Sequence, residues 1–162
     1  HPTNQSLKLN DKKKLEPMMT LACSEKIPIT IHGSEPVGHK YPGKGESGPK
    51  KLFDFIEMFP DNIIILAHWG GGLLFYELME EVKKISENVY YDTATTSFLY
   101  DSKIFKIACE LVGSKKIIFG TDYPLLTAKR ILNEMKELNQ EDIKNITYKN
   151  IKSIFNINYE NE

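Results

Sequence analysis

The chain has 162 residues, which is enough for one domain with a sizeable hydrophobic core. Its 21 basic and 22 acidic residues give a formal net charge of −1 and are spread along the chain, which argues against nucleic acid or an anionic membrane as a partner. No apolar run is long enough to span a bilayer, and the two cysteines form no paired motif, so we expect a cytoplasmic protein with reduced thiols.

The predicted elements alternate between helix and strand. A helical pattern over 11–24 comes first, and four short apolar runs then predict strands at 28–32, 63–67, 89–93 and 117–121. Helical periodicity follows each run, at 49–59, 73–85, 102–112 and from about 127, and a last helix covers 140–155. Because these runs are apolar throughout, they are typical of parallel strands that helices cover.

Three of the predicted strands end on a residue that can bind a metal or move a proton. The run PITIHGS ends on His32, IIILAHWGGG on His68 and IIFGTDYP on Asp122. The carboxyl ends of parallel strands lie at one edge of a sheet, where ligands bind in such folds. Imidazole and carboxylate are usual zinc ligands, so the pattern predicts a metal site at this edge. The alternatives are structural histidines and a turn role for Asp122.

Residues after the second strand are candidates for substrate binding. Trp69 could wall a pocket or only pack in the core. Gly70 and Gly71 open the next predicted helix, where free N–H groups could hold a substrate carboxylate, or where a tight turn could require glycine.

Two further segments border the predicted strand ends. The Gly- and Pro-rich segment 35–49 is long enough to act as a lid, and His39 within it is a candidate substrate contact. Asp92, near the end of the third strand, could orient a ligand histidine or cap a turn.

The ordered set IPITIHGS, IIILAHWGGG, NVYYDTA and IIFGTDYPL, with the closing NITYKNIKSIFNI, resembles the second half of the amidohydrolase-2 group of the amidohydrolase superfamily. The resemblance implies an α/β fold of the (β/α)8 TIM-barrel type. Residues 1–162 would form a single domain that is a fragment of the barrel, with strands five to eight in the order 1-2-3-4 and a C-terminal helix. It also implies that His32, Asp122 and His68 bind a divalent metal, with zinc favoured, and that Asp122 and His68 are catalytic.

The chain departs from the family at its start. The HxH pair of the family's first strand has no match here, and a whole barrel needs about 250 residues. The opening HPTNQ resembles the end of the fourth strand, so His1 could face the site. In half a barrel we expect exposed apolar area near Ile64, Leu66 and Ile118, and we expect the donor atoms of His32 and Asp122 to lie roughly 3–4 Å apart around one metal.

The function that the resemblance implies is a metal-dependent hydrolase that acts on a small, carboxylated substrate through a metal-activated water. The fragment alone would be inactive. A decarboxylase of the same family is the alternative, and a non-catalytic α/β module that binds an anion without a metal is the second. We expect a small-molecule substrate as partner, and the sequence leaves a homo-oligomer open.

Overall fold

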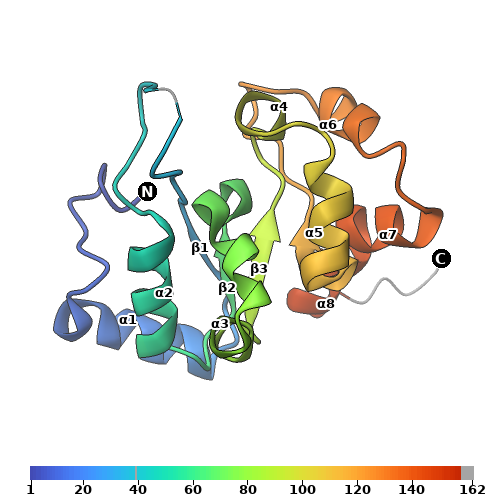
Figure 1. The fold of residues 1–162 in the computed structure, drawn as a ribbon. Helices are drawn as coiled ribbons and strands as arrows, with labels where there is room; N and C mark the ends of the chain where they lie inside the picture. Colours follow the sequence, from blue (N-terminus) through green and yellow to red (C-terminus); the bar gives the residue numbers. More distant parts are fainter. Residues whose placement is uncertain (39, 158–162) are drawn as a thin grey trace.

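The computed structural model describes residues 1–38 and 40–157. Four strands form one parallel sheet in the order β1-β2-β3-β4, which confirms the predicted sequential order. The strands are β1 (Ile29–Ile31), β2 (Ile64–Leu66), β3 (Val89–Asp92) and β4 (Ile117–Ile118). They stand side by side in the centre of the molecule, with helices around them (Figure 1).

Helical segments connect the strands, and they differ from the prediction in several places. The expected helix over 73–85 is divided into an irregular segment η1 and a helix α3, and the expected helix over 140–155 is divided into α7, η3 and α8. The short segments α4, after β3, and η2, before β4, were not predicted. None of the helices in the described residues is both long and apolar enough to cross a bilayer. The segments are α1 (Lys12–Ser24), α2 (Pro49–Met58), η1 (His68–Leu78), α3 (Glu80–Ile85), α4 (Thr96–Leu99), α5 (Ile104–Val112), η2 (Ser114–Lys116), α6 (Ala128–Glu134), α7 (Gln140–Lys144), η3 (Asn145–Lys149) and α8 (Asn150–Ile154).

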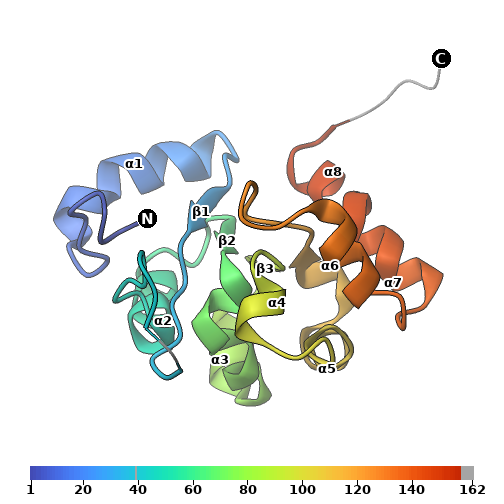
Figure 2. The same ribbon diagram turned by 90° about the horizontal axis from the view of Figure 1, so that it is seen from above.

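One face of the sheet packs against α2, η1 and α5, which lie together on one side of the strands (Figure 2). Alternate strand residues share a face, and the parallel register sets Ile31, Leu66, Tyr91 and Ile117 in one row on this side. All four are buried in the main hydrophobic cluster. The opposite face carries a smaller cluster in which Ile65 and Ile118 pack with Ile154 of α8.

The expected exposure of Ile64, Leu66 and Ile118 is wrong. Ile64 and Leu66 are fully buried under the helices, because they share the face of the main cluster rather than that of the site. Ile118 does lie on the other face, where Ile154 covers it and leaves it 5% exposed. The burial of Ile64 and Leu66 therefore gives no information about the exposure of the opposite face of the sheet.

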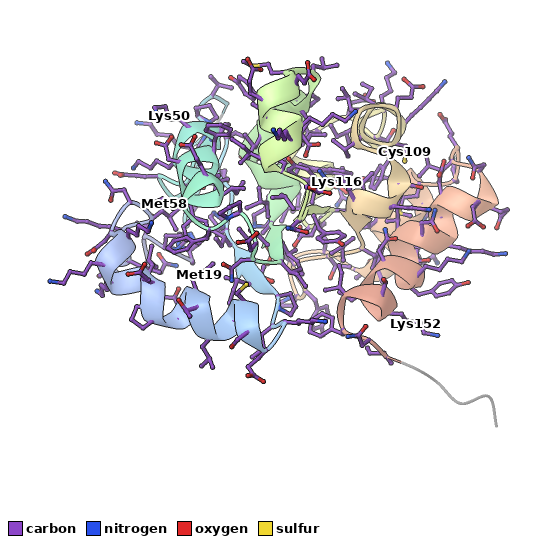
Figure 3. The ribbon with its side chains drawn as sticks, turned by 90° about the horizontal axis from the view of Figure 1, so that it is seen from below. Met19, Lys50, Met58, Cys109, Lys116 and Lys152 are labelled. Atoms are coloured by element: carbon purple, nitrogen blue, oxygen red, sulfur yellow. The ribbon has the colours of Figure 1, made fainter. Side chains whose placement is uncertain are left out.

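A buried ion pair joins the helical layer to the sheet. Lys116 Nζ donates to both carboxylate oxygens of Glu77 at 2.9 Å and to the carbonyl oxygen of Ser86 at 2.7 Å. The Tyr91 hydroxyl donates to Glu77 at 2.7 Å. Lys116 accordingly lies in the middle of the molecule, whereas Lys50 lies at its periphery (Figure 3).

Candidate functional site

The residues that end the strands line one cavity of about 590 Å³. His32 directly follows β1, His68 follows β2 and Asp122 follows β4, so the shared direction of the strands brings them to the same edge. The His32 and His68 rings meet edge to face, with their centroids 4.8 Å apart. The structure thus places the three predicted residues around one space.

His32 has a ring nitrogen that could bind a metal or accept a proton. Its Nε2 atom is buried and finds no hydrogen-bond partner within residues 1–38 and 40–157. Burial, together with the charge of His68, lowers the pKa of His32 to about 4. The ring therefore stays neutral near pH 7 and keeps a lone pair available.

His68 lies in an unusual turn of the main chain. Residues His68 to Gly72 all have positive φ, from 56° to 92°, which is rare for residues other than glycine. Asp92 holds the start of this turn, because its Oδ1 atom accepts the main-chain N–H groups of His68 and Ala94, both at 2.9 Å. Asp92 therefore bonds to the backbone of His68 and not to its ring, which supports the turn-capping alternative.

The ring of His68 is held by the turn after β3. Its Nδ1 atom lies 2.8 Å from Oγ1 of Thr95 and 3.2 Å from the carbonyl oxygen of Ala94. No hydrogen-bond partner of Nε2 is found within the described residues. The ring is buried, with 7% of His68 exposed, and Thr95 lines the cavity beside it.

His1 and the segment after β1 form the cavity's outer wall. The His1 ring stacks on His32 with a centroid distance of 4.0 Å. Its Nε2 atom bonds to the carbonyl oxygen of Gly43 at 2.8 Å, and its Nδ1 atom accepts the N–H of Asn4 at 3.2 Å. Tyr41, Pro42 and Gly43 also line the cavity, so the segment 35–49 does border the site. The candidate His39 lies outside the described residues.

Asp122 combines both alternatives considered for it. Its φ of 62° is left-handed and its carbonyl oxygen accepts the N–H of Leu125 at 2.9 Å, so its main chain forms a turn. Its exposed side chain lines the cavity and, within the described residues, has no hydrogen-bond partner. Gly120, two residues earlier, makes room for Asp92, because a Cβ there would lie 3.3 Å from the carboxylate carbon of Asp92.

The site holds part of a metal-ligand set. The buried, unpartnered Nε2 of His32 and the free carboxylate of Asp122 are the nitrogen and oxygen donors that zinc and similar ions accept. However, residues 1–38 and 40–157 contain no group of three or more His, Cys, Asp or Glu side chains arranged to hold a metal. A complete set of three protein ligands is therefore not found in this part of the chain, and the convergence of His32 and Asp122 on one ion, like their ligand roles, stays a prediction.

Trp69, Gly70 and Gly71 do not line the cavity, which corrects their assignment to substrate binding. Trp69 is fully buried, donates from Nε1 to Thr96 at 2.9 Å and packs edge to face on Phe105. Both glycines lie in the left-handed turn that precedes the regular helix, so they do not form a helix N-terminus. A Cβ on Gly71 would lie 2.5 Å from the carbonyl oxygen of Ser34, which explains the need for glycine there.

Thr95 and Tyr41 are two of the cavity-lining residues that the sequence analysis missed. Thr95 lies in the run DTATT directly after the third strand, at the edge where the other site residues were found. Its position directly after a strand could have identified Thr95 as a candidate site residue. Tyr41 comes from the long loop, and only the folded loop shows which of its residues meet the cavity.

Comparisons with known proteins support this arrangement. A sequence model of the amidohydrolase family matches residues 1–158. No curated protein matches the chain.

Several solved structures share the fold. A dihydroxybenzoic acid decarboxylase from a Polaromonas species, with bound manganese, has a TM-score of 0.71 at 18% identity over 88% of this chain and 54% of its own. A 5-carboxyvanillate decarboxylase from Sphingomonas paucimobilis has a TM-score of 0.69 at 14% identity over 88% and 53%. A Burkholderia multivorans amidohydrolase with bound zinc has a TM-score of 0.62 at 9% identity over 93% and 63%. The chain thus spans about half the length of these proteins, and its fold is that of a partial barrel.

Proposed function

Because the chain belongs to the amidohydrolase family, we infer that the whole protein is a metal-dependent enzyme that acts on a small, carboxylated substrate. One observation carries this inference: His32, with a buried and unpartnered Nε2 atom, shares a cavity with His68 and Asp122. The buried Nε2 of His32, for which the described residues offer no partner, is poorly explained by packing, since unpaired polar groups cost stability when buried.

His32 and Asp122 would hold a divalent ion, for which zinc is our first choice, and His68 would either join them or act beside them. When bound, such an ion polarises substrate oxygens and lowers the pKa of a bound water to about 7. Asp122 is exposed to the cavity and can take up or deliver a proton at the reacting atom. His68 can accept a proton on a free ring nitrogen and, once protonated, donate it to a developing oxyanion.

Decarboxylation of an aromatic acid is the first candidate reaction. Phe98, Leu99 and Leu125 line the same cavity as the histidines, and these apolar side chains suit an aromatic ring. Decarboxylases of hydroxylated aromatic acids are among the solved structures with this fold. Hydrolysis is the second candidate, because an amidohydrolase with bound zinc also shares the fold.

The test uses the whole protein that contains this chain. Metal content is measured by mass spectrometry, and 2,6-dihydroxybenzoate and p-nitrophenyl acetate serve as probes of decarboxylation and hydrolysis. We expect bound divalent metal and turnover of one probe that a chelator abolishes and added zinc or manganese restores. A protein that neither contains metal nor binds added zinc or manganese would contradict the proposal.

A further inference from the structure

We propose that Thr95 is a positioning residue that holds the neutral His68 ring in the tautomer with its proton on Nδ1. Nε2 then keeps a free lone pair. The inference deepens the proposed function. The role of Nε2 in the reaction depends on the proposed function, whereas the tautomer of the ring does not.

The donors and acceptors around Nδ1 lead to this form. The Thr95 hydroxyl oxygen lies 2.7 Å from the carbonyl oxygen of Ala94, a distance at which two oxygens need a hydrogen between them, and only the hydroxyl can supply it. The hydroxyl oxygen, 2.8 Å from Nδ1 of His68, can then only accept. The second neighbour of Nδ1 is the carbonyl oxygen of Ala94 at 3.2 Å, which cannot donate at all. Since both neighbours are acceptors, Nδ1 must carry the proton and Nε2 must not.

The backbone of Thr95 adopts a strained conformation where its side chain makes this contact. Thr95 has φ 59° and ψ 14°, a left-handed conformation that a β-branched residue adopts rarely. Strained conformations of this kind persist where the surroundings enforce them, and they gather at functional sites.

The neighbouring threonines of the same turn have structural partners instead. Thr93 Oγ1 donates to the carbonyl oxygen of Gly120 at 2.9 Å, and Thr96 Oγ1 donates to that of Thr93 at 2.6 Å while accepting from Trp69. Thr95 is the threonine of this run whose hydroxyl reaches a site residue, which separates its role from the others.

His1 provides an internal comparison. Its Nδ1 atom accepts the main-chain N–H of Asn4, and its Nε2 atom faces the carbonyl oxygen of Gly43, which can only accept. The same reasoning therefore gives His1 the opposite form, with the proton on Nε2. Two of the four histidines of this chain should differ in tautomer within one molecule.

The experiment is a long-range ¹H–¹⁵N spectrum of the metal-free chain labelled at histidine, recorded near pH 8.5, above the ordinary imidazole pKa of ~6.5. We expect the nitrogen shifts of His68 to show protonated Nδ1 and those of His1 to show protonated Nε2. In Thr95→Val, which keeps the shape and the β-branch, the preference of His68 for the Nδ1–H form should fall about three- to tenfold, as expected for the loss of one hydrogen bond. Thr95→Ser should restore it.

Thr147→Val is the matched control, because it removes a hydroxyl that donates to a carbonyl oxygen, that of Ile143 at 2.7 Å, outside the site. It should leave the His68 signals unchanged. A His68 ring protonated on Nε2 in the unmodified chain would overturn the proposal even if Thr95→Val failed to fold, and so would an unchanged His68 spectrum in a folded Thr95→Val variant. Because no metal or substrate enters this measurement, the tautomer can be as expected while the whole protein shows no metal-dependent turnover, in which case only the proposed function fails.

Discussion

The carboxylate of Asp92 accepts the main-chain N–H of His68 at 2.9 Å and so fastens the end of β3 to the turn that carries a site histidine. The same Oδ1 atom also accepts the N–H of Ala94 at 2.9 Å. One side chain thus sets the backbone of two neighbouring strand ends.

Asp92→Ala should therefore destabilise the fold. Two main-chain donors lose their partner, and at 1–3 kcal/mol for each such group we expect a loss of about 2–6 kcal/mol in the free energy of unfolding. Asp92→Asn keeps a side-chain oxygen at the same place and should lose clearly less. Urea denaturation of both variants checks this, and equal losses would mean that the two hydrogen bonds contribute little.

Asp122→Asn tests the chemical role of the exposed carboxylate. The substitution keeps the size of the side chain and removes its charge, so the melting temperature should stay within a few degrees. In the whole protein we expect weaker binding of zinc and turnover lower by at least ~10²-fold, the usual scale for a positioned proton-transfer group. Full turnover at unchanged metal content would show that Asp122 serves only its turn.

Lys116→Met should destabilise the fold, because it leaves the buried carboxylate of Glu77 without its cation. The side chain of Glu77 is 1% exposed, and among the described residues it would keep only the Tyr91 hydroxyl as a partner. We expect a loss of about 3 kcal/mol in the free energy of unfolding. Lys50→Met is the matched control, because its pair with Asp54 lies on the surface, and it should cost less than about 1 kcal/mol. Similar losses from the two variants would contradict the assignment.

Gly71→Ala should be far more harmful than Gly72→Ala. Both glycines have left-handed backbones, with φ 58° and ψ 27° at Gly71 and φ 92° and ψ 5° at Gly72, so the backbone cost of a Cβ is similar, at about 1–2 kcal/mol. Only at Gly71 would the Cβ meet main-chain atoms, those of Ser34 at 2.5 to 2.8 Å, whereas at Gly72 the nearest atoms belong to the side chains of Tyr100 and Phe75, at 3.5 and 3.8 Å. Melting temperatures of the two variants separate the clash from the backbone cost, and equal values would count against the tight turn.

Cys109 should react slowly with alkylating reagents at pH 8. Burial raises the pKa of its thiol to about 12, with smaller contributions from Asp142 and Glu110. Because a raised pKa keeps the neutral thiol up to higher pH and only the thiolate reacts, iodoacetamide should modify Cys109 in a Cys23→Ser variant at least ~100-fold more slowly than glutathione. The rate should rise with pH beyond the range of a free thiol and become ordinary in urea. A rate close to that of glutathione at pH 8 in the folded chain would contradict this.

The sequence alone determined the order of elements and the edge at which the chemistry lies. Runs that are apolar throughout, alternating with helical periodicity, are enough to predict parallel strands, and the direction of such strands brings His32, His68 and Asp122 to one side. Those inferences depend on local pattern and on a general rule of chain connection, and the structure confirms the strand order and the shared cavity.

Only the tertiary structure decided which neighbours of these residues touch the site. Strict alternation along β2 would put His68 on the same face as Ile64 and Leu66. The left-handed backbone at His68 breaks this alternation, so His68 lines the cavity while Ile64 and Leu66 lie under the helices. Trp69 turns into the core for the same reason, while Thr95, from another strand end, reaches the imidazole of His68. Positive φ at a residue other than glycine is enforced by contacts from distant parts of the chain, here the carboxylate of Asp92, and such contacts have no local signal in the sequence.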